Sequence, residues 1–174
     1  GLMAALFEET GRYIAMRCLV KPMDFPNAFM FGAGHGGVEA MLLCGVASIR
    51  IIASAVMINS GTMSAQLATL DAEKAADTAA ALSALWTTPS LTFFAGGVER
   101  IIAVVLHLSL SILVFQSIRK KSQKDLLNAY LFHFVIDSLS VLLSAVASVW
   151  VVELVTALVT GGAVLMARYA CMKE

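Results

Sequence analysis

The stretch Phe31-Gly-Ala-Gly-His35-Gly-Gly-Val-Glu39-Ala40 places a histidine and a glutamate four residues apart inside a long apolar segment. If this stretch is helical, His35 and Glu39 share one face, and Gly32 and Gly36 also lie together. Glycines at this spacing allow a neighbouring membrane helix to approach closely. An ionisable pair is costly in lipid, so it indicates either a functional site or a histidine that bonds a backbone carbonyl.

The composition assigns the chain to a class of protein. Its 174 residues are 59% hydrophobic and only 14% charged, whereas a soluble domain is typically about 25% charged. The net charge is zero at pH 7, so the chain has no basic footprint for nucleic acid. We therefore expect a membrane protein in contact with the lipid bilayer, with no nucleic-acid partner.

Five apolar segments are each close to the roughly 20 residues that a bilayer crossing requires. They cover residues 2–20, 31–58, 90–118, 125–145 and 148–171. The prolines at 22 and 26 predict a loop between the first two, and the alanine-rich residues 59–90 predict a weakly amphipathic helix along the membrane interface. We predict an all-α, polytopic transmembrane helix bundle with about five membrane helices and one short interfacial helix. It forms one domain over residues 1–174, which we expect to be an N-terminally truncated fragment because the first helix begins at once after Gly1.

Basic residues indicate the orientation of this bundle in the cell membrane. Arg17 ends the first predicted helix, Arg168 ends the fifth, and a cluster over residues 119–124 follows the third. Five alternating crossings place all three groups on the same side. Because cytoplasmic loops are rich in lysine and arginine, we predict a multi-pass protein with residues 119–124 in the cytoplasm and residues 59–90 on the opposite side.

Several ionisable residues fall deep inside the predicted helices. Counting from the basic markers at about 1.5 Å per residue places them about 13–20 Å inside a hydrocarbon core about 30 Å thick. A charged side chain at the centre of a membrane helix costs about 2.5–3.5 kcal/mol, so these side chains must converge on one another or on water. We expect one cavity lined by Glu8, Glu9, His35, His107, His133 and Asp137.

Helical spacing suggests which of these residues share a face. Glu8 and Arg12 are four residues apart, and so are His133 and Asp137. In the second pair, the carboxylate could orient the imidazole or join it in binding a ligand.

Three charged residues lie outside these pairs. Glu99 and Arg100 are adjacent near one end of the third predicted helix, where we interpret them as a buried ion pair that holds helices together. Glu153 has no partner at helical spacing within its own helix, which suggests a packing residue or a residue that faces a polar lumen.

The ordered motifs Glu8-Glu9-x-x-Arg12, Phe31-x-x-x-His35 and His133-x-x-x-Asp137 resemble those of the CAAX-protease and bacteriocin-processing superfamily of intramembrane proteases. Arg12 comes one residue earlier than the arginine of that superfamily's first motif. The stretches Glu8–Tyr13, Gly34–Glu39 and Gly97–Arg100, followed by His107, are more closely similar to the YhfC family of bacterial membrane peptidases. The resemblance extends over essentially the whole chain.

The resemblance implies an intramembrane protease that hydrolyses a membrane protein or peptide with a glutamate-activated water. Glu8 would then be the base, with Glu9 beside it, and His35 would position the water. His133, oriented by Asp137, would stabilise the oxyanion. No cofactor is favoured in this scheme. The expected catalytic set is Glu8, Glu9, Arg12, His35, Glu39, His107, His133 and Asp137, of which Glu39 and His107 have no counterpart in the superfamily's pattern.

Other functions stay open at this point. A zinc-dependent protease could bind its metal through His35, His107 and His133 with one open position for water, although the chain contains no HExxH motif. Buried acids and histidines also form the relays of proton-coupled transporters. A catalytically inactive membrane scaffold is a further alternative, although every motif residue is present.

Overall fold

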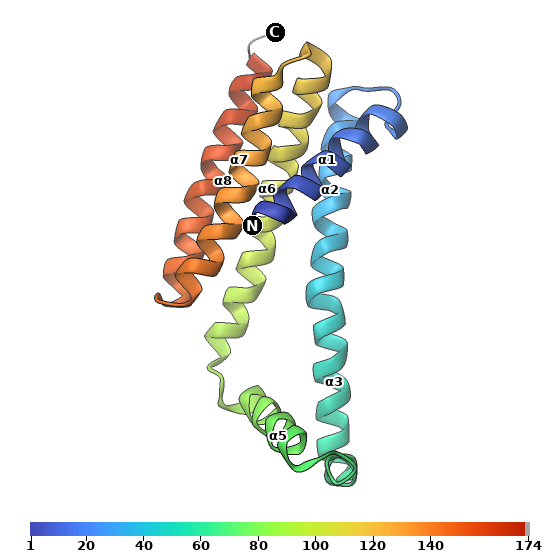
Figure 1. Ribbon diagram of the computed structural model, residues 1–174, viewed down its shortest axis with the longest axis vertical. Helices are drawn as coiled ribbons and strands as arrows, with labels where there is room; N and C mark the ends of the chain where they lie inside the picture. Colours follow the sequence, from blue (N-terminus) through green and yellow to red (C-terminus); the bar gives the residue numbers. More distant parts are fainter. Residues whose placement is uncertain (173–174) are drawn as a thin grey trace. The chain divides into compact units, whose positions relative to one another are not determined.

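The computed structural model describes residues 1–172, which form helices and connecting turns without any strand (Figure 1). The helices are α1 (Leu2–Leu19), α2 (Phe25–Ala40), the π-helical turn η1 (Met41–Gly45), α3 (Val46–Asn59), α4 (Thr62–Leu67), α5 (Ala72–Thr87), α6 (Ser90–Lys120), α7 (Gln123–Ser144) and α8 (Val149–Met172). The chain divides into two compact units. The first unit comprises Gly1–Val38 and the chain from Ala95 onward, and the second comprises Glu39–Phe94.

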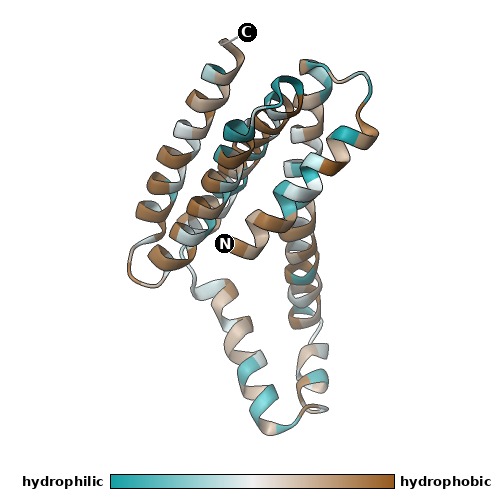
Figure 2. Ribbon diagram, turned by 45° about the horizontal axis from the view of Figure 1, so that its top comes forward, coloured by the Kyte–Doolittle hydropathy of each residue, from teal (hydrophilic) through white to brown (hydrophobic). Residues whose placement is uncertain are grey.

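The predicted all-α, polytopic architecture is confirmed, with four segments long and apolar enough to span a membrane. They are Phe25–Asn59, Ser90–Lys120, Gln123–Ser144 and Val149–Met172. The first predicted span also forms a helix, α1. It is not counted among the segments apolar enough to span a membrane, because four charged side chains occur within its 18 residues. Figure 2 shows hydrophobic residues along α7 and α8, whereas hydrophilic residues gather in α5 and in the turn between α6 and α7.

Helix α1 buries a single stripe of side chains. Ala5, Glu9, Arg12 and Met16 are all buried, and their spacing of three or four residues places them on one face. This helix packs against α7, where the Thr10 and Tyr130 hydroxyls lie 2.7 Å apart. The stripe carries a glutamate and an arginine into the interior of the first unit.

Helix α2 begins earlier than its prolines suggested. It starts at Phe25 rather than at residue 31, and Pro26 lies in its first turn. Proline is tolerated there because the first amide groups of a helix have no intrahelical acceptor. The Asp24 carboxylate caps the helix by accepting a hydrogen bond from the Asn27 amide at 3.0 Å. The predicted loop is therefore shorter, and the corrected start adds a full turn before the histidine motif.

Helix α6 is the central helix of the first unit. Between Leu106 and Ser117 its side chains are buried on every face, as expected for a helix surrounded by others. Gln116 Nε2 donates to Cys171 Sγ of α8 at 3.2 Å. A Cβ atom added to Gly32 of α2 would lie 2.9 Å from the Cα of Leu108. The close approach indicated by the glycine spacing therefore occurs between α2 and α6.

The turn from α6 to α7 has two stabilising features. Lys121 has a left-handed conformation with φ of 54°, and the Ser122 amide bonds Ser117 O at 3.0 Å, which is the pattern that closes many helix C-termini. Ser122 Oγ then accepts from the Asp125 amide at 3.4 Å and caps α7. Helix α7 continues against α8.

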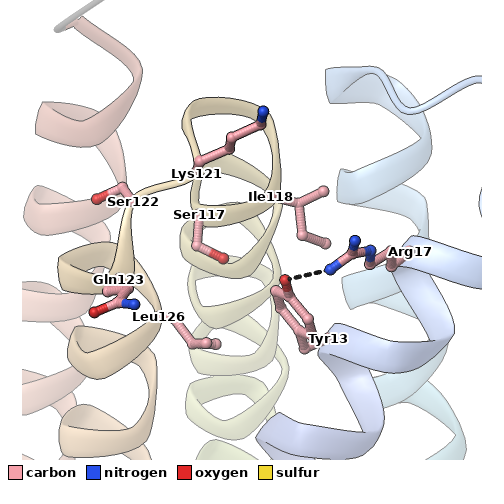
Figure 3. Close-up of a pocket in the computed structure, with 8 residues that line it drawn as sticks. All are labelled: Tyr13, Arg17, Ser117, Ile118, Lys121, Ser122, Gln123 and Leu126. Carbon is pink, nitrogen blue, oxygen red and sulfur yellow. Dashed lines mark hydrogen bonds between the residues drawn. The ribbon is translucent and has the colours of Figure 1, made fainter.

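Basic residues of separate helices gather at this end of the unit. Arg17 and Lys121 line one pocket of about 460 Å³, drawn in Figure 3, where Arg17 Nη1 donates to the Tyr13 hydroxyl at 3.1 Å. Lys120 Nζ donates to Ala170 O near the end of α8. The grouping agrees with the orientation argument, while the membrane side that these residues face stays a prediction.

Within the second unit, residues 59–90 form two helices, α4 and α5, where the sequence predicted one. Gly61 turns the chain with a left-handed φ of 74°, which costs glycine little. The Asp71 carboxylate caps α5 by accepting from the Lys74 amide at 2.9 Å. The side-chain hydrogen bond from Lys74, together with that amide, holds the pKa of Asp71 below its usual value. Placement of these helices along the membrane interface stays a prediction.

Candidate active site

The two adjacent glutamates of α1 face different surroundings. Successive residues of an α-helix point about 100° apart, since a turn contains 3.6 residues. The Glu9 side chain is completely buried, whereas that of Glu8 is 36% exposed. Glu8 lies against His35 of α2, and Glu9 lies against His133 of α7. The pair therefore divides the site into an accessible part and a buried part.

Glu8 lies between two imidazoles. Its Oε2 atom is 3.2 Å from His35 Nε2 and 3.8 Å from His133 Nε2. Phe31, one turn before His35, has its ring centroid 6.5 Å from that of the histidine. His35 is 25% exposed, so this part of the site is open to small molecules.

Glu9 forms the buried part with Arg12 and His133. Glu9 Oε1 lies 2.7 Å from His133 Nδ1 and 3.4 Å from Arg12 Nη2. The sequence spacing suggested that Arg12 shares a face with Glu8, but in the structure its ion pair is with Glu9, three residues away. Opposite charges that are both desolvated compensate one another's burial. His133 Nε2 is also 3.6 Å from Asp137 Oδ2, so both ring nitrogens face carboxylates.

Arg12 also connects α1 to His107 of α6. Its Nη1 atom donates to the backbone oxygen of His107 at 3.2 Å, and Nη2 lies 2.7 Å from His107 Nδ1. Because arginine can only donate, Nδ1 must accept this hydrogen bond. A neutral His107 therefore carries its ring proton on Nε2. Sequence reasoning left the role of Arg12 open, and the structure shows that it orients this imidazole.

The three histidines of the chain converge although they come from α2, α6 and α7. The ring centroids of His35 and His107 are 4.6 Å apart in a stacked arrangement. Those of His107 and His133 are 5.7 Å apart and meet edge to face. Gly36 allows this approach, because a Cβ atom there would lie 3.2 Å from the Cβ of His107.

Part of this cluster has the donor atoms of a metal site. Ligand atoms of Glu8, His35 and His107 all lie within 4.8 Å of one another. Glu39 lies one turn beyond His35 on helix α2, at the start of the second unit. Imidazole nitrogens and carboxylate oxygens suit Zn²⁺. The chemistry of the donors therefore fits a metal, with one exception: His107 Nε2 carries a proton while Arg12 occupies Nδ1.

His133 is not part of this donor group. The sequence alternative assigned the metal to His35, His107 and His133, but His133 Nδ1 bonds Glu9 and its Nε2 faces Glu8 and Asp137. Within the described part of the first unit, the clustered ligand atoms belong instead to Glu8, His35 and His107, one carboxylate and two imidazoles. The structure thus brings the three histidines together, but it pairs His133 with carboxylates instead of placing it in the group of potential metal ligands.

Comparison with known proteins gives a family. The model of the family described as YhfC intramembrane metalloprotease matches residues 1–156. An uncharacterized membrane protein YhfC of Bacillus subtilis (strain 168) is 40% identical over 133 residues, which are 76% of this chain and 51% of that protein. The chain thus spans about half the length of this curated relative. No solved structure gives a significant match. The family description favours metal dependence, so the expectation of a reaction without a cofactor is not supported.

Proposed function

The chain belongs to the YhfC family, and on this premise we propose that it carries the active site of a metal-dependent intramembrane protease. Its substrates are membrane proteins or peptides, because the site lies among helices that are apolar enough to span a bilayer. The observation that carries the proposal is that metal-ligand atoms of Glu8 and His35 lie within 4.8 Å of one another, beside oriented imidazoles at His107 and His133.

Glu8 and His35 hold the metal in this proposal. They offer one carboxylate and one imidazole, and both kinds of ligand are common at catalytic zinc sites. A bound Zn²⁺ supplies Lewis acidity, which makes a water nucleophilic near neutral pH and polarises a carbonyl.

His133 moves the proton. Glu9 accepts from His133 Nδ1–H at 2.7 Å, which fixes the tautomer and leaves Nε2 free to accept a proton from the attacking water. The resulting imidazolium is stabilised by Glu8 and Asp137, whose oxygens lie 3.8 and 3.6 Å from Nε2. The same nitrogen then protonates the leaving amine.

His107 stabilises the developing oxyanion. Because Arg12 Nη2 occupies Nδ1, a neutral His107 carries its ring proton on Nε2, and this N–H is the donor in the proposed step. The Arg12 contacts to the ring and to the backbone oxygen hold this donor in one orientation before substrate binds. Removing a preorganised donor of this kind typically lowers kcat by about 10²–10³-fold.

The experiment measures metal content and peptide cleavage in parallel. Wild-type chain and variants are purified in detergent, dialysed against buffered Zn²⁺, and tested on a quenched fluorescent transmembrane peptide. His35→Ala should lose both bound metal and activity, because it removes a ligand. His107→Ala and His133→Ala should keep the metal and lose activity. Asp77→Asn, on the exposed face of α5 in the second unit, is the control and should change neither.

The same experiment separates the metal-dependent reaction from the metal-free glutamate mechanism. The contact between Glu8 Oε2 and His35 Nε2 at 3.2 Å would also suit a glutamate base beside a water-positioning histidine. Full activity in metal-stripped protein with excess chelator would establish that mechanism instead. Loss of metal from His107→Ala but not from His35→Ala would overturn the ligand assignment.

A further inference from the structure

A second polar cavity lies in the first unit where α7 connects to α8, at the end opposite the turn between α6 and α7 (Figure 1). Its volume is about 330 Å³. The polar residues that line it are Glu99 of α6, Ser140 and Ser144 of α7, and Glu153 and Thr156 of α8. Glu99 precedes His107 by eight residues on α6, so the cavity is displaced by about 12 Å along the helix axis from the candidate active site.

Glu153 is the unexplained group in this cavity. It is only 7% exposed, and its Oε2 atom accepts no hydrogen bond from any residue between 1 and 172. An ionised carboxylate that is removed from water costs several kcal/mol unless a partner compensates it. Buried polar atoms without partners are rare in folded proteins, so such an atom indicates a ligand or ion.

The hydroxyl groups around Glu153 present oxygen atoms rather than protons. Ser140 Oγ donates its proton to Ile136 O at 2.8 Å, and Ser144 Oγ donates to Ser140 O at 2.6 Å. Thr156 Oγ1 donates to Glu153 O at 3.1 Å. Because a hydroxyl has a single proton, these three groups can offer only lone pairs to anything in the cavity.

The local charge is negative. Glu99 pairs with Arg100, and both are close enough to Glu153 for their charges to act on it. Two carboxylates and one guanidinium leave one net negative charge. The C-terminus of α7, at Ser144, also lies at the wall of the cavity. A helix C-terminus carries a partial negative charge that favours cations.

We propose that this cavity binds a hard metal cation through Glu153, Glu99 and the three hydroxyl oxygens. Its donors are all oxygen atoms, which suit Ca²⁺, Mg²⁺ or Na⁺, whereas Zn²⁺ prefers the nitrogen-containing cluster of the candidate active site. Among these cations, Ca²⁺ fits best, because it accepts irregular oxygen sites with several ligands and long bonds. The ion connects α6, α7 and α8 at the end of the unit where α7 turns into α8.

The test uses Tb³⁺, an oxygen-seeking luminescent substitute for Ca²⁺, with energy transfer from Trp150. This tryptophan lies one turn before Glu153 on α8, about 4.5 Å along the axis. The purified chain is first saturated with Zn²⁺ so that the histidine cluster does not contribute. We expect a saturable Tb³⁺ signal that Ca²⁺ displaces, and separate titrations with Mg²⁺ and Na⁺ identify which cation competes best.

Glu153→Gln should weaken Tb³⁺ and Ca²⁺ binding by at least about tenfold, equivalent to about 1.4 kcal/mol. Glutamine keeps the size and hydrogen-bonding capacity of glutamate, so the fold should survive, and circular dichroism verifies this. Thr156→Val, which removes one oxygen ligand, gives a second and independent reduction. Glu73→Gln on α5 is the matched control and should leave binding unchanged. Displacement by none of the three cations, or equal affinities in wild type and in both site variants, would overturn the proposal.

Discussion

Replacing Gly32 with alanine tests the close contact on which the site depends. A Cβ atom at this position would lie 2.9 Å from both Leu108 Cα and Ser111 Cβ and 3.0 Å from His107 O. Carbon atoms normally pack at about 3.5–4.0 Å, so α2 must move away from α6 by about 1 Å. The first two obstructing atoms belong to the backbone or to a Cβ, which cannot rotate out of the way.

The magnitude follows from two opposing effects. Overpacking of a close contact costs about 1–3 kcal/mol, while alanine gains about 1 kcal/mol over glycine from helix propensity. We therefore expect Gly32→Ala to lower the free energy of unfolding by about 0–2 kcal/mol. The effect on catalysis should be larger, because His35 moves with α2, and a misplacement of 1 Å costs about 10²-fold in rate.

Gly34→Ala provides the matched control. It lies two residues away on the same helix, and a Cβ atom there meets nothing within 4 Å. This variant gains the same helix propensity without the clash, so the two variants should differ in stability by the overpacking term alone, about 1–3 kcal/mol. Chemical unfolding in detergent and peptide cleavage are measured on both. Equal stability and equal activity in the two variants would refute the close packing of α2 on α6.

Two further predictions concern single contacts. Arg12→Lys should lower stability by about 1.5–3 kcal/mol for the lost charged hydrogen bonds, because one ammonium group cannot reach Glu9 and both His107 acceptors; unchanged chemical unfolding would contradict this. For α5, the lowered pKa of Asp71 means that its cap stabilises the helix above the ordinary carboxyl pKa and loses this effect as the pH falls through the lowered value. The protection factors of the α5 amides, measured relative to the intrinsic exchange rate at each pH, should therefore fall on acidification in wild type, and this fall should be absent from Asp71→Asn.

The sequence predicts the helical architecture well because lipid imposes a strong constraint. A backbone in hydrocarbon must satisfy its own hydrogen bonds, so long apolar stretches form helices. This argument identified α3, α6, α7 and α8, with small errors at their ends. The first segment also forms a helix, α1, but its four charged side chains make it too polar to be recognised as a membrane span by composition, so its crossing stays a prediction. The argument failed at Pro26, where a proline in the first turn of a helix resembles a proline in a loop.

The convergence of ionisable residues was predictable from their depth, but their pairing was not. Depth depends on helix rise alone, so it brings His107 and His133 to the same level without any knowledge of the fold. Pairing depends on how each helix is rotated about its axis, and spacings of three and four residues both fit one face. The sequence therefore could not decide whether Arg12 pairs with Glu8 or with Glu9. The bond from Arg12 to His107 joins residues of different helices and has no local sequence signal.

The rotation of α1 also determines which glutamate can take part in chemistry. Glu9 is completely buried, and its carboxylate engages Arg12 and His133. Removing one member of such a buried pair costs about 3–5 kcal/mol, because the other charge is left uncompensated. Glu8 is 36% exposed, so its charge remains in contact with solvent. Its carboxylate can therefore exchange the hydrogen bond with His35 for a contact with a metal or a water. The adjacent glutamates therefore differ in their surroundings: Glu9 holds the two imidazoles in place through Arg12 and His133, and Glu8 is the one that can present its carboxylate to the proposed reaction.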